Sequence, residues 1–179
     1  MIQFERITST DHPQYPWMEN LMTESFPSEE RRDDEKQRTL INTQKDFFCN
    51  LLIEDGNAVG MMNYWQMDGF VYLEHFAVDP QRRNGGFGQQ ALNTLKSTVH
   101  SPIILEAEEP NDEMSKRRIG FYQRQGFILQ ETEYLQPPYR EGDGFLPLKL
   151  MTYGELDMKV HAKEVIAQMY ERAYEVKKA

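Results

Sequence analysis

A glycine-rich segment in the middle of the chain has the composition of an anion-binding loop. Gly85, Gly86 and Gly88 carry no side chains, so a ligand can come close to the backbone N–H groups there. Apolar residues recur at helical spacing over residues 91–99, which places these N–H groups in the first turn of a helix. The unpaired donors and the positive dipole end of a helix favour phosphate. The segment therefore predicts a site for a phosphate-bearing ligand.

A strand must lead into this loop. The apolar segment Val71–Val78 ends at Asp79, because Pro80 cannot donate to a continuing strand and disfavours helix at the residue before it. Arg82 and Arg83 then add positive charge, although Arg82 fits an ordinary solvated loop charge equally well.

Two motifs carry a family resemblance. The segment from Arg83 to Gly88 is similar to the Arg/Gln-x-x-Gly-x-Gly/Ala signature of the GNAT acyl-CoA-dependent N-acyltransferases. The segment from Arg118 to Phe127 resembles the Phe-Tyr-x-x-x-Gly-Phe helix end of the same family. A strand-like segment lies between the two motifs, in the order that this family shows, and two motifs in order are far more specific than one.

The resemblance implies a fold and a domain organisation. We expect an α/β (α+β) chain with a mixed, mostly antiparallel central sheet of about seven strands flanked by helices. We also expect a single N-acetyltransferase domain over residues 1–179, with an amphipathic C-terminal helix over residues 154–177.

The other predicted elements follow from hydrophobic periodicity and turn residues. They are a strand at 2–7, helices at 16–26 and 28–41, a hairpin of 47–54 and 58–66 around Asp55-Gly56-Asn57, and strands at 102–106, 127–134 and 145–152.

The resemblance also implies acetyl-CoA as the co-substrate and no metal. Backbone amides and arginines can meet the phosphates of CoA, and the pantetheine arm is expected along the edge of the strand that ends at Val78. Ser115 stands where family members often carry a CoA-binding asparagine. The expected cofactor-binding residues are Phe76, Ala77, Val78, Arg82, Arg83, Asn84, Gly85, Gly86, Phe87, Gly88 and Ser115.

Tyr122 is the candidate general acid. In the family, a tyrosine at this helix position protonates the departing CoA thiolate, and a phenol with a pKa near 10 is protonated at neutral pH. The alternative is a packed aromatic ring beside Phe121 and Phe127.

Glu74 is the candidate general base for a primary amine that attacks the thioester directly. A carboxylate in a central strand is costly to bury without a partner or a task. Its alternative role is a structural pair with an arginine or lysine. His75 faces the opposite side of the strand and fits an interior histidine better. Glu106 and Glu108 are weaker candidates for the base.

The formal net charge of −9 argues against nucleic acid and favours a small cationic amine or a protein amino group as acceptor. By the resemblance, the acceptor pocket involves the Phe26-Pro27 junction and residues 136–140, where Tyr139 either closes over a substrate or packs a rigid turn.

No membrane segment or leader is expected, and the single Cys49 fits a cytoplasmic protein. The sequence leaves a homodimer open.

Two other interpretations compete with this one. An all-parallel dinucleotide fold would use Gly86-x-Gly88-x-x-Ala91, but its fingerprint normally opens the domain and follows its strand directly. A non-catalytic CoA-binding or protein-interaction module would need neither Tyr122 nor Glu74.

Overall fold

The computed structural model describes residues 1–176, which form two compact units. Unit 1 consists of residues 1–66 and 73–100. Unit 2 consists of residues 67–72 and the chain from residue 101 onward. Whether the whole chain is one domain stays a prediction.

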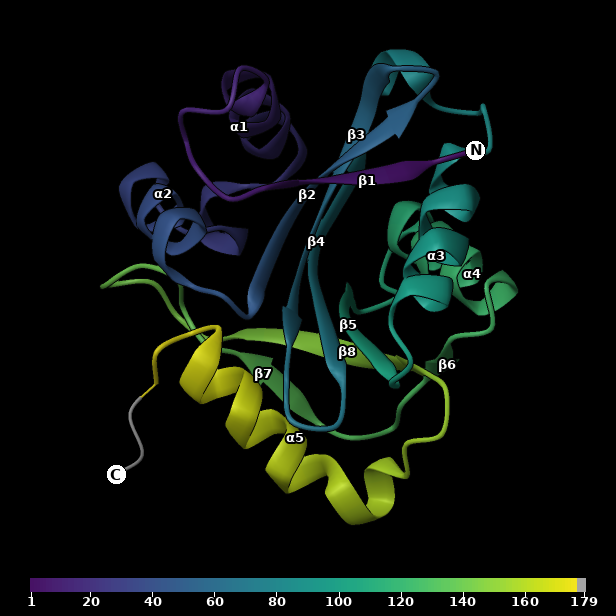
Figure 1. Cartoon of the computed structure of the whole chain (residues 1–179). Coiled ribbons are helices and arrows are strands. Elements are labelled where there is room, and N and C mark those ends of the chain that lie inside the picture. The colour runs from purple at the N-terminus through teal and green to yellow at the C-terminus, as the bar shows by residue number, and fades with distance from the viewer. Residues whose placement is uncertain (177–179) are drawn as a thin grey trace. The chain divides into compact units, whose positions relative to one another are not determined.

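Unit 1 contains an antiparallel set of strands with helices on both sides. The strands follow the order β1-β2-β3-β4. Figure 1 shows α1 and α2 on one side of these strands and α3 on the other. The elements are β1 (Gln3–Ile7), α1 (Tyr15–Ser25), η1 (Ser28–Glu30), α2 (Asp34–Thr43), β2 (Phe47–Glu54), β3 (Asn57–Gln66), β4 (Val71–Val78, which begins in unit 2), η2 (Pro80–Arg82) and α3 (Phe87–Thr98).

Local sequence explains the strand pairing of unit 1. Asp55 and Gly56 have φ angles of 49° and 77°, as a tight hairpin turn between β2 and β3 requires, so the predicted hairpin is confirmed. Gly60 lies close to β4, because a Cβ atom added there would come within 2.5 Å of the Ala77 carbonyl oxygen. Only glycine permits this approach of the two backbones.

The predicted helix over residues 28–41 is wrong in its first turns. The short η1 is followed by an extended Arg31 with φ −146° and ψ 154°. The Asp33 side chain accepts a hydrogen bond from the Lys36 backbone at 2.8 Å, so α2 begins at Asp34. The Asp33 N-cap therefore starts a new helix within the charged segment that was predicted to be one continuous helix.

Unit 2 contains a second set of strands built around β8. Strands β5, β6 and β7 each pair with β8 in antiparallel orientation. Figure 1 shows α5 passing along β7 and β8. The elements are β5 (Ile103–Glu108), α4 (Glu113–Arg124), β6 (Ile128–Leu129), β7 (Tyr134–Gln136), β8 (Leu146–Tyr153) and α5 (Met158–Arg172).

Two predicted elements of unit 2 have different bounds. The expected strand at 127–134 is two short strands, β6 and β7, with no pairing between them. The C-terminal helix begins at Met158, where the Asp157 side chain caps the Lys159 backbone at 2.9 Å, and it ends at Arg172. Lys177, the predicted last residue of this helix, lies outside the described residues.

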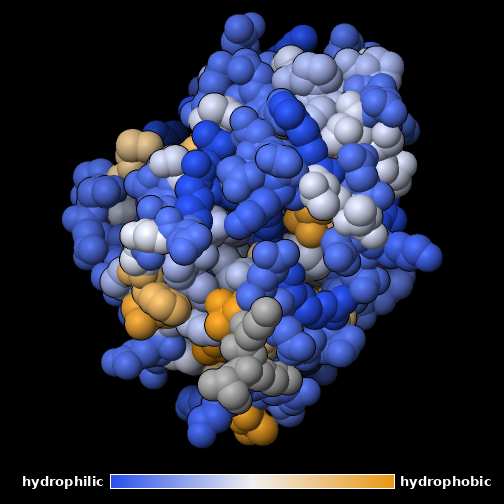
Figure 2. Space-filling model, turned by 90° about the vertical axis from the view of Figure 1, so that its left-hand side faces the viewer, coloured by the Kyte–Doolittle hydropathy of each residue, from blue (hydrophilic) through white to orange (hydrophobic). Residues whose placement is uncertain are grey.

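The predicted fold class is confirmed, with eight strands among the described residues. The antiparallel pairs contradict the all-parallel dinucleotide fold. None of the described helices combines the length and apolarity that a membrane span needs. On the face shown in Figure 2, hydrophilic residues predominate and hydrophobic ones form small separate groups.

Candidate active site

The glycine loop of unit 1 has the geometry of an anion cradle. Asn84 and Gly86 have positive φ angles of 67° and 74°, and Gly86 is the N-cap residue of α3, which begins at Phe87. Residues 80–86 are exposed. Left-handed residues in such a turn make concave sets of N–H groups that bind anions, and the first turn of α3 adds its own unpaired donors. These residues fit the phosphates of an acyl-CoA.

The side chains around the loop leave this backbone open. Arg82 and Arg83 are exposed and form no ion pair with any residue that the structure describes. The Phe87 ring covers Gly85, since a Cβ atom there would lie 2.8 Å from the ring. The two arginines are therefore free to meet a negatively charged ligand.

The other predicted CoA contacts lie on β4 and α4. Phe76 and Val78 are partly exposed and Ala77 is buried. Ser115 is buried in unit 2, where it forms the capping box of α4: its hydroxyl accepts from the Asp112 backbone N–H at 3.2 Å, and the Asp112 side chain accepts from the Ser115 backbone N–H at 2.8 Å. Ser115 thus contributes to the start of α4. That Ser115 and the β4 residues bind CoA stays a prediction.

Tyr122 lies near the C-terminal end of α4 and is half-buried. Its ring packs edge-on against Phe121 and Phe127, with centroids 5.3 and 5.6 Å apart. Burial raises the pKa of Tyr122 to about 12, and the positive charge of Arg118 opposes this increase. The phenol is therefore protonated at neutral pH and can serve as an acid, although its ring also has the packing contacts of the alternative interpretation.

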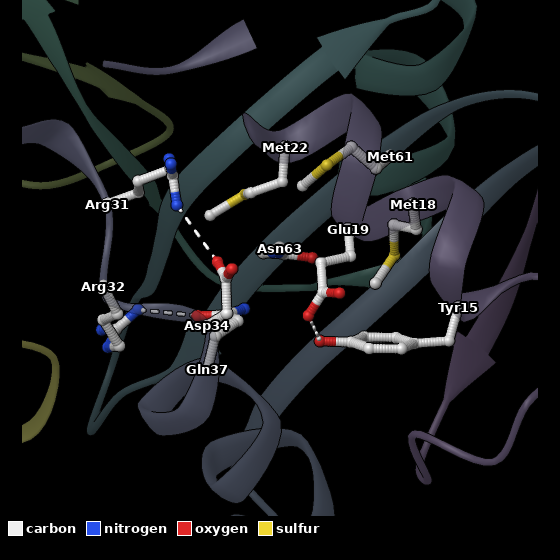
Figure 3. Close-up of a pocket in the computed structure, with 10 residues that line it drawn as sticks. All are labelled: Tyr15, Met18, Glu19, Met22, Arg31, Arg32, Asp34, Gln37, Met61 and Asn63. Atoms are coloured by element: carbon white, nitrogen blue, oxygen red, sulfur yellow. Dashed lines mark hydrogen bonds and ion pairs between the residues drawn. The ribbon is translucent and has the colours of Figure 1, made fainter. Parts of the chain in front are cut away.

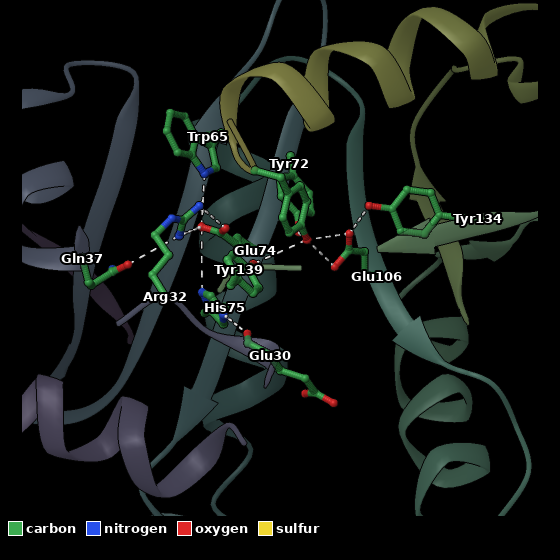
Figure 4. A network of polar contacts seen from close by, with 11 residues as sticks. Glu30, Arg32, Gln37, Trp65, Tyr72, Glu74, His75, Glu106, Tyr134 and Tyr139 are labelled. Carbon is green, nitrogen blue, oxygen red and sulfur yellow. Dashed lines mark hydrogen bonds and ion pairs between the residues drawn. The ribbon is translucent and has the colours of Figure 1, made fainter. Parts of the chain in front are cut away.

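Glu74 is held in a buried ion pair (Figure 4). Arg32 donates to both of its carboxylate oxygens, Nη1 at 3.0 Å and Nη2 at 2.5 Å, and Trp65 Nε1 donates to Oε2 at 3.1 Å. The Glu74 side chain is 0 % exposed and that of Arg32 is 8 % exposed. These contacts match the alternative interpretation of Glu74, in which it forms a structural pair with an arginine instead of acting as a general base.

His75 has the interior environment that its position on the strand predicts. It is 2 % exposed, its Nε2 donates to the Glu30 carbonyl at 2.8 Å, and its ring meets Phe26 edge-on at 4.7 Å. Burial lowers the pKa of His75 below its usual value, against the opposing effect of the Glu74 charge. His75 is therefore neutral at neutral pH and joins β4 to the segment after α1.

Glu106, a weaker candidate from the sequence, lies at the centre of a phenol cluster in unit 2 (Figure 4). Tyr134 donates to Oε1, and the Tyr174 hydroxyl lies 2.8 Å from each carboxylate oxygen. The Tyr174 hydroxyl also meets those of Tyr72 at 2.8 Å and Tyr139 at 3.4 Å. Tyr139 is thus packed inside the unit, which agrees with the packing alternative for this residue.

Tyr174 and Tyr72 were not predicted as site residues, because they come from a segment after α5 and from β4. No local pattern joins them to Glu106. Glu108 is half exposed and pairs with Arg118 at 3.2 Å.

A pocket in unit 1 lies between α1, α2 and β3 (Figure 3). We call it the α1–α2 pocket. Its lining combines methionines with polar and charged side chains, and it is close in sequence to the Phe26-Pro27 junction that was expected to shape the acceptor site. The lining residues are Tyr15, Met18, Glu19, Met22, Arg31, Arg32, Asp34, Gln37, Met61 and Asn63.

The glycine turn of unit 1 defines a class of site. It exposes backbone donors at the start of a helix, which is the geometry of a site for a phosphate-bearing ligand.

Comparison with known proteins gives the family. The model of the Acetyltransferase (GNAT) family matches residues 6–127, so the chain belongs to this family. Members of this family use acyl-CoA and acetylate amine acceptors.

Individual relatives agree with this assignment. A solved structure described as "Putative acetyltransferase from GNAT family from Bacteroides thetaiotaomicron" is 44% identical, with a TM-score of 0.94 over 98% of this chain and 99% of that chain. The "Putative acetyltransferase YjbC" of Bacillus subtilis (strain 168) is 27% identical over 113 residues, which are 62% of this chain and 56% of that protein. This chain thus spans little more than half the length of that relative.

The ribosomal-protein-S18-alanine N-acetyltransferase of Escherichia coli shares the fold. It is 21% identical, with a TM-score of 0.60 over 86% of this chain and 93% of that chain.

Proposed function

We propose that this chain moves an acetyl group from acetyl-CoA to a primary amine by direct attack, in the cytoplasm. The observation that carries this proposal is the exposed turn before α3, with Gly86 at φ 74°. When bound, acetyl-CoA supplies an activated thioester. The turn from Arg83 to Gly88 would hold its phosphates, and the partly exposed Phe76 and Val78 of β4 would lie along the pantetheine arm.

Tyr122 is the general acid of this proposal. As the new C–N bond forms and the C–S bond breaks, the phenol gives its proton to the sulfur that leaves. Its pKa of about 12 means that this proton is present at every pH below that value. The acid form is lost only as the pH rises through about 12.

The proton of the amine goes to Glu106 in this proposal rather than to Glu74. The Arg32 guanidinium and the Trp65 indole that bind Glu74 are donors only, so neither can accept a proton and pass one on to this carboxylate. The phenols on Glu106 can both donate and accept, so a phenol that receives the amine proton passes its own proton to the carboxylate. A base or relay of this kind contributes ~10²–10⁴ to the rate.

Release of free thiol from acetyl-CoA in the presence of a panel of amines tests the proposal. We expect thiol release that depends on at least one primary amine, with the N-acetyl product identified by mass. Binding of acetyl-CoA without transfer to any amine would instead support a non-catalytic CoA-binding module.

Gly86→Val should abolish the stabilisation of the protein by acetyl-CoA. A ligand at a hundredfold excess over Kd stabilises the native state by ~2.7 kcal/mol, so acetyl-CoA should raise the Tm of the wild-type protein, whereas NAD should not. A valine is strained at φ 74°, and its side chain would keep phosphates from the amides. Thermal unfolding with each ligand measures both effects.

Gly56→Val is the matched control for this variant. Gly56 has a similar φ of 77° and open space around it, but it lies in the hairpin turn between β2 and β3. It should lower the Tm through the same strain and keep the shift caused by acetyl-CoA. A shift that survives Gly86→Val, or a shift with NAD alone, would contradict the assigned ligand.

A further inference from the structure

A tyrosine just after α5 connects several polar side chains of unit 2. The Tyr174 hydroxyl lies 2.8 Å from each carboxylate oxygen of Glu106. It also lies 2.8 Å from the Tyr72 hydroxyl, and it accepts a hydrogen bond from Tyr139 at 3.4 Å. A hydroxyl has one hydrogen and two lone pairs. Because the hydrogen of Tyr174 goes to the carboxylate, Tyr72 is the donor in the bond between these two phenols.

This order of donors favours the ionised form of Glu106. Burial and the negative charge of Glu106 raise the pKa of both Tyr174 and Tyr134 above its usual value, so these phenols keep their hydrogens in the pH range of an assay. Hydrogen bonds donated to a carboxylate stabilise its charged form. The titratable side chains that act on Glu106, directly or through Tyr174, include Tyr72, Tyr134, Tyr139, Tyr170 and Tyr174.

The surrounding chain fixes the position of Tyr174. The Gln168 side chain of α5 accepts from the Asp68 backbone N–H at 3.0 Å and donates to the Asp68 carbonyl at 3.3 Å, which holds the helix within unit 2. Glu175 has a φ angle of 56°, which residues with a side chain rarely adopt, and the next backbone N–H donates back to the helix at 2.9 Å. This turn closes the end of α5 and keeps Tyr174 buried beside Glu106.

We propose that Tyr174 is the positioning residue of Glu106: its hydroxyl keeps this carboxylate ionised and oriented, so the segment after α5 completes the proton acceptor of unit 2. The inference rests on the proposed function, in which Glu106 takes the proton of the amine, and all of its groups belong to unit 2. Tyr174 acts through Glu106. Loss of its hydroxyl should therefore change the pH at which Glu106 works and leave the reaction at high pH largely intact.

Tyr174→Phe tests this role through the pH dependence of the reaction. The variant keeps the ring, which packs against the Tyr139 ring at 4.8 Å, and loses only the hydroxyl. Without this donor the carboxylate should take up a proton at a pH about one to two units higher, because hydrogen bonds to charged groups are strong. The ratio of kcat/KM in the variant to that in the wild-type enzyme should fall by up to about 10- to 100-fold as the pH is lowered. This ratio removes the effect of amine protonation, which is the same for both enzymes.

An NMR titration measures the same shift without any transfer reaction. Protein labelled with 13C at the side-chain carboxyl of glutamate gives a signal for each glutamate, and Glu106→Gln identifies the signal of Glu106. We expect the titration midpoint of this signal to be higher in Tyr174→Phe. Tyr72→Phe should give a smaller shift in the same direction, because the Tyr72 donor strengthens the bond from Tyr174 to the carboxylate.

Tyr170→Phe is the matched control. Tyr170 lies on α5 about one turn before Tyr174, and its hydroxyl donates to the backbone carbonyl of Leu135. This variant also removes a phenol hydroxyl from unit 2, so it should lower the Tm. It should leave the titration midpoint of Glu106 and the ratio of kcat/KM values unchanged at every pH.

The outcomes separate this proposal from the proposed function. A higher midpoint in Tyr174→Phe, with no amine acetylated by the wild-type protein, would support the hold of Tyr174 on Glu106 while the proposed transfer fails. An unchanged midpoint would overturn the proposal whether or not the enzyme acetylates an amine. A loss of activity that is the same at every pH would overturn it as well, because the hydroxyl would then serve only the stability of the fold.

Discussion

Tyr122→Phe is expected to lower kcat by ~10²–10⁴ while the affinity for acetyl-CoA changes little. The substitution keeps the ring that packs against Phe121 and Phe127 and removes only the hydroxyl. The leaving sulfur then has to take its proton from water. Steady-state kinetics with a saturating amine measures kcat, and the shift in Tm with acetyl-CoA measures binding.

The pKa of Tyr122 adds a second readout. The acid form persists to about pH 12, so the wild-type enzyme should show no loss of activity from this group between neutral pH and the alkaline limit of the assay. Tyr153→Phe is a matched control, because the Tyr153 ring also lies against Phe127, at 5.5 Å. Wild-type activity in Tyr122→Phe would mean that the phenol is core packing and that water protonates the thiolate.

Local features of this fold could be predicted from sequence because their causes are local. The turn before α3 follows from glycines beside an apolar helix pattern, and the β2–β3 hairpin follows from Asp55 and Gly56, which accept positive φ angles. The beginning of α2 was missed because charged residues fill both η1 and the first turn of α2. Their pattern does not distinguish an N-cap at Asp33 from the interior of a helix.

The candidate site was only partly predictable, because its decisive contacts join distant segments. The partner of Glu74 is 42 residues away in sequence, and Tyr174 is 68 residues from Glu106. The strand pattern shows that the carboxylate of Glu74 is buried, but not whether it forms an ion pair with a positively charged side chain.

The Arg32–Glu74 pair positions the chain between η1 and α2. Glu74 holds the Arg32 side chain, and the next residue of β4, His75, holds the Glu30 carbonyl. Two consecutive residues of one strand thus hold the segment that leads into α2 and borders the α1–α2 pocket. Loss of this anchor should affect the fold of unit 1 before it affects proton transfer.

Glu74→Gln is therefore expected to reduce the free energy of unfolding by about 3–5 kcal/mol, because it leaves the Arg32 charge buried without its partner. Urea unfolding should show a lower midpoint. Glu113→Gln, which breaks the exposed pair with Lys116, should cost at most ~1 kcal/mol. The double variant Arg32→Met with Glu74→Leu should recover much of the loss, since apolar residues of similar size can replace a buried ion pair.

The same variant separates the two roles of Glu74. If the carboxylate positions the chain, the activity per folded molecule of Glu74→Gln keeps the pH dependence of the wild-type enzyme, whereas Glu106→Gln loses activity most at low pH, where the amine is protonated and needs a base. A Glu74→Gln protein that unfolds at the wild-type urea midpoint, and whose activity is lost at low pH but recovers as the pH rises, would return the general base to Glu74. The proton would then have to reach a carboxylate that Arg32 already holds, which requires Arg32 to move during each turnover.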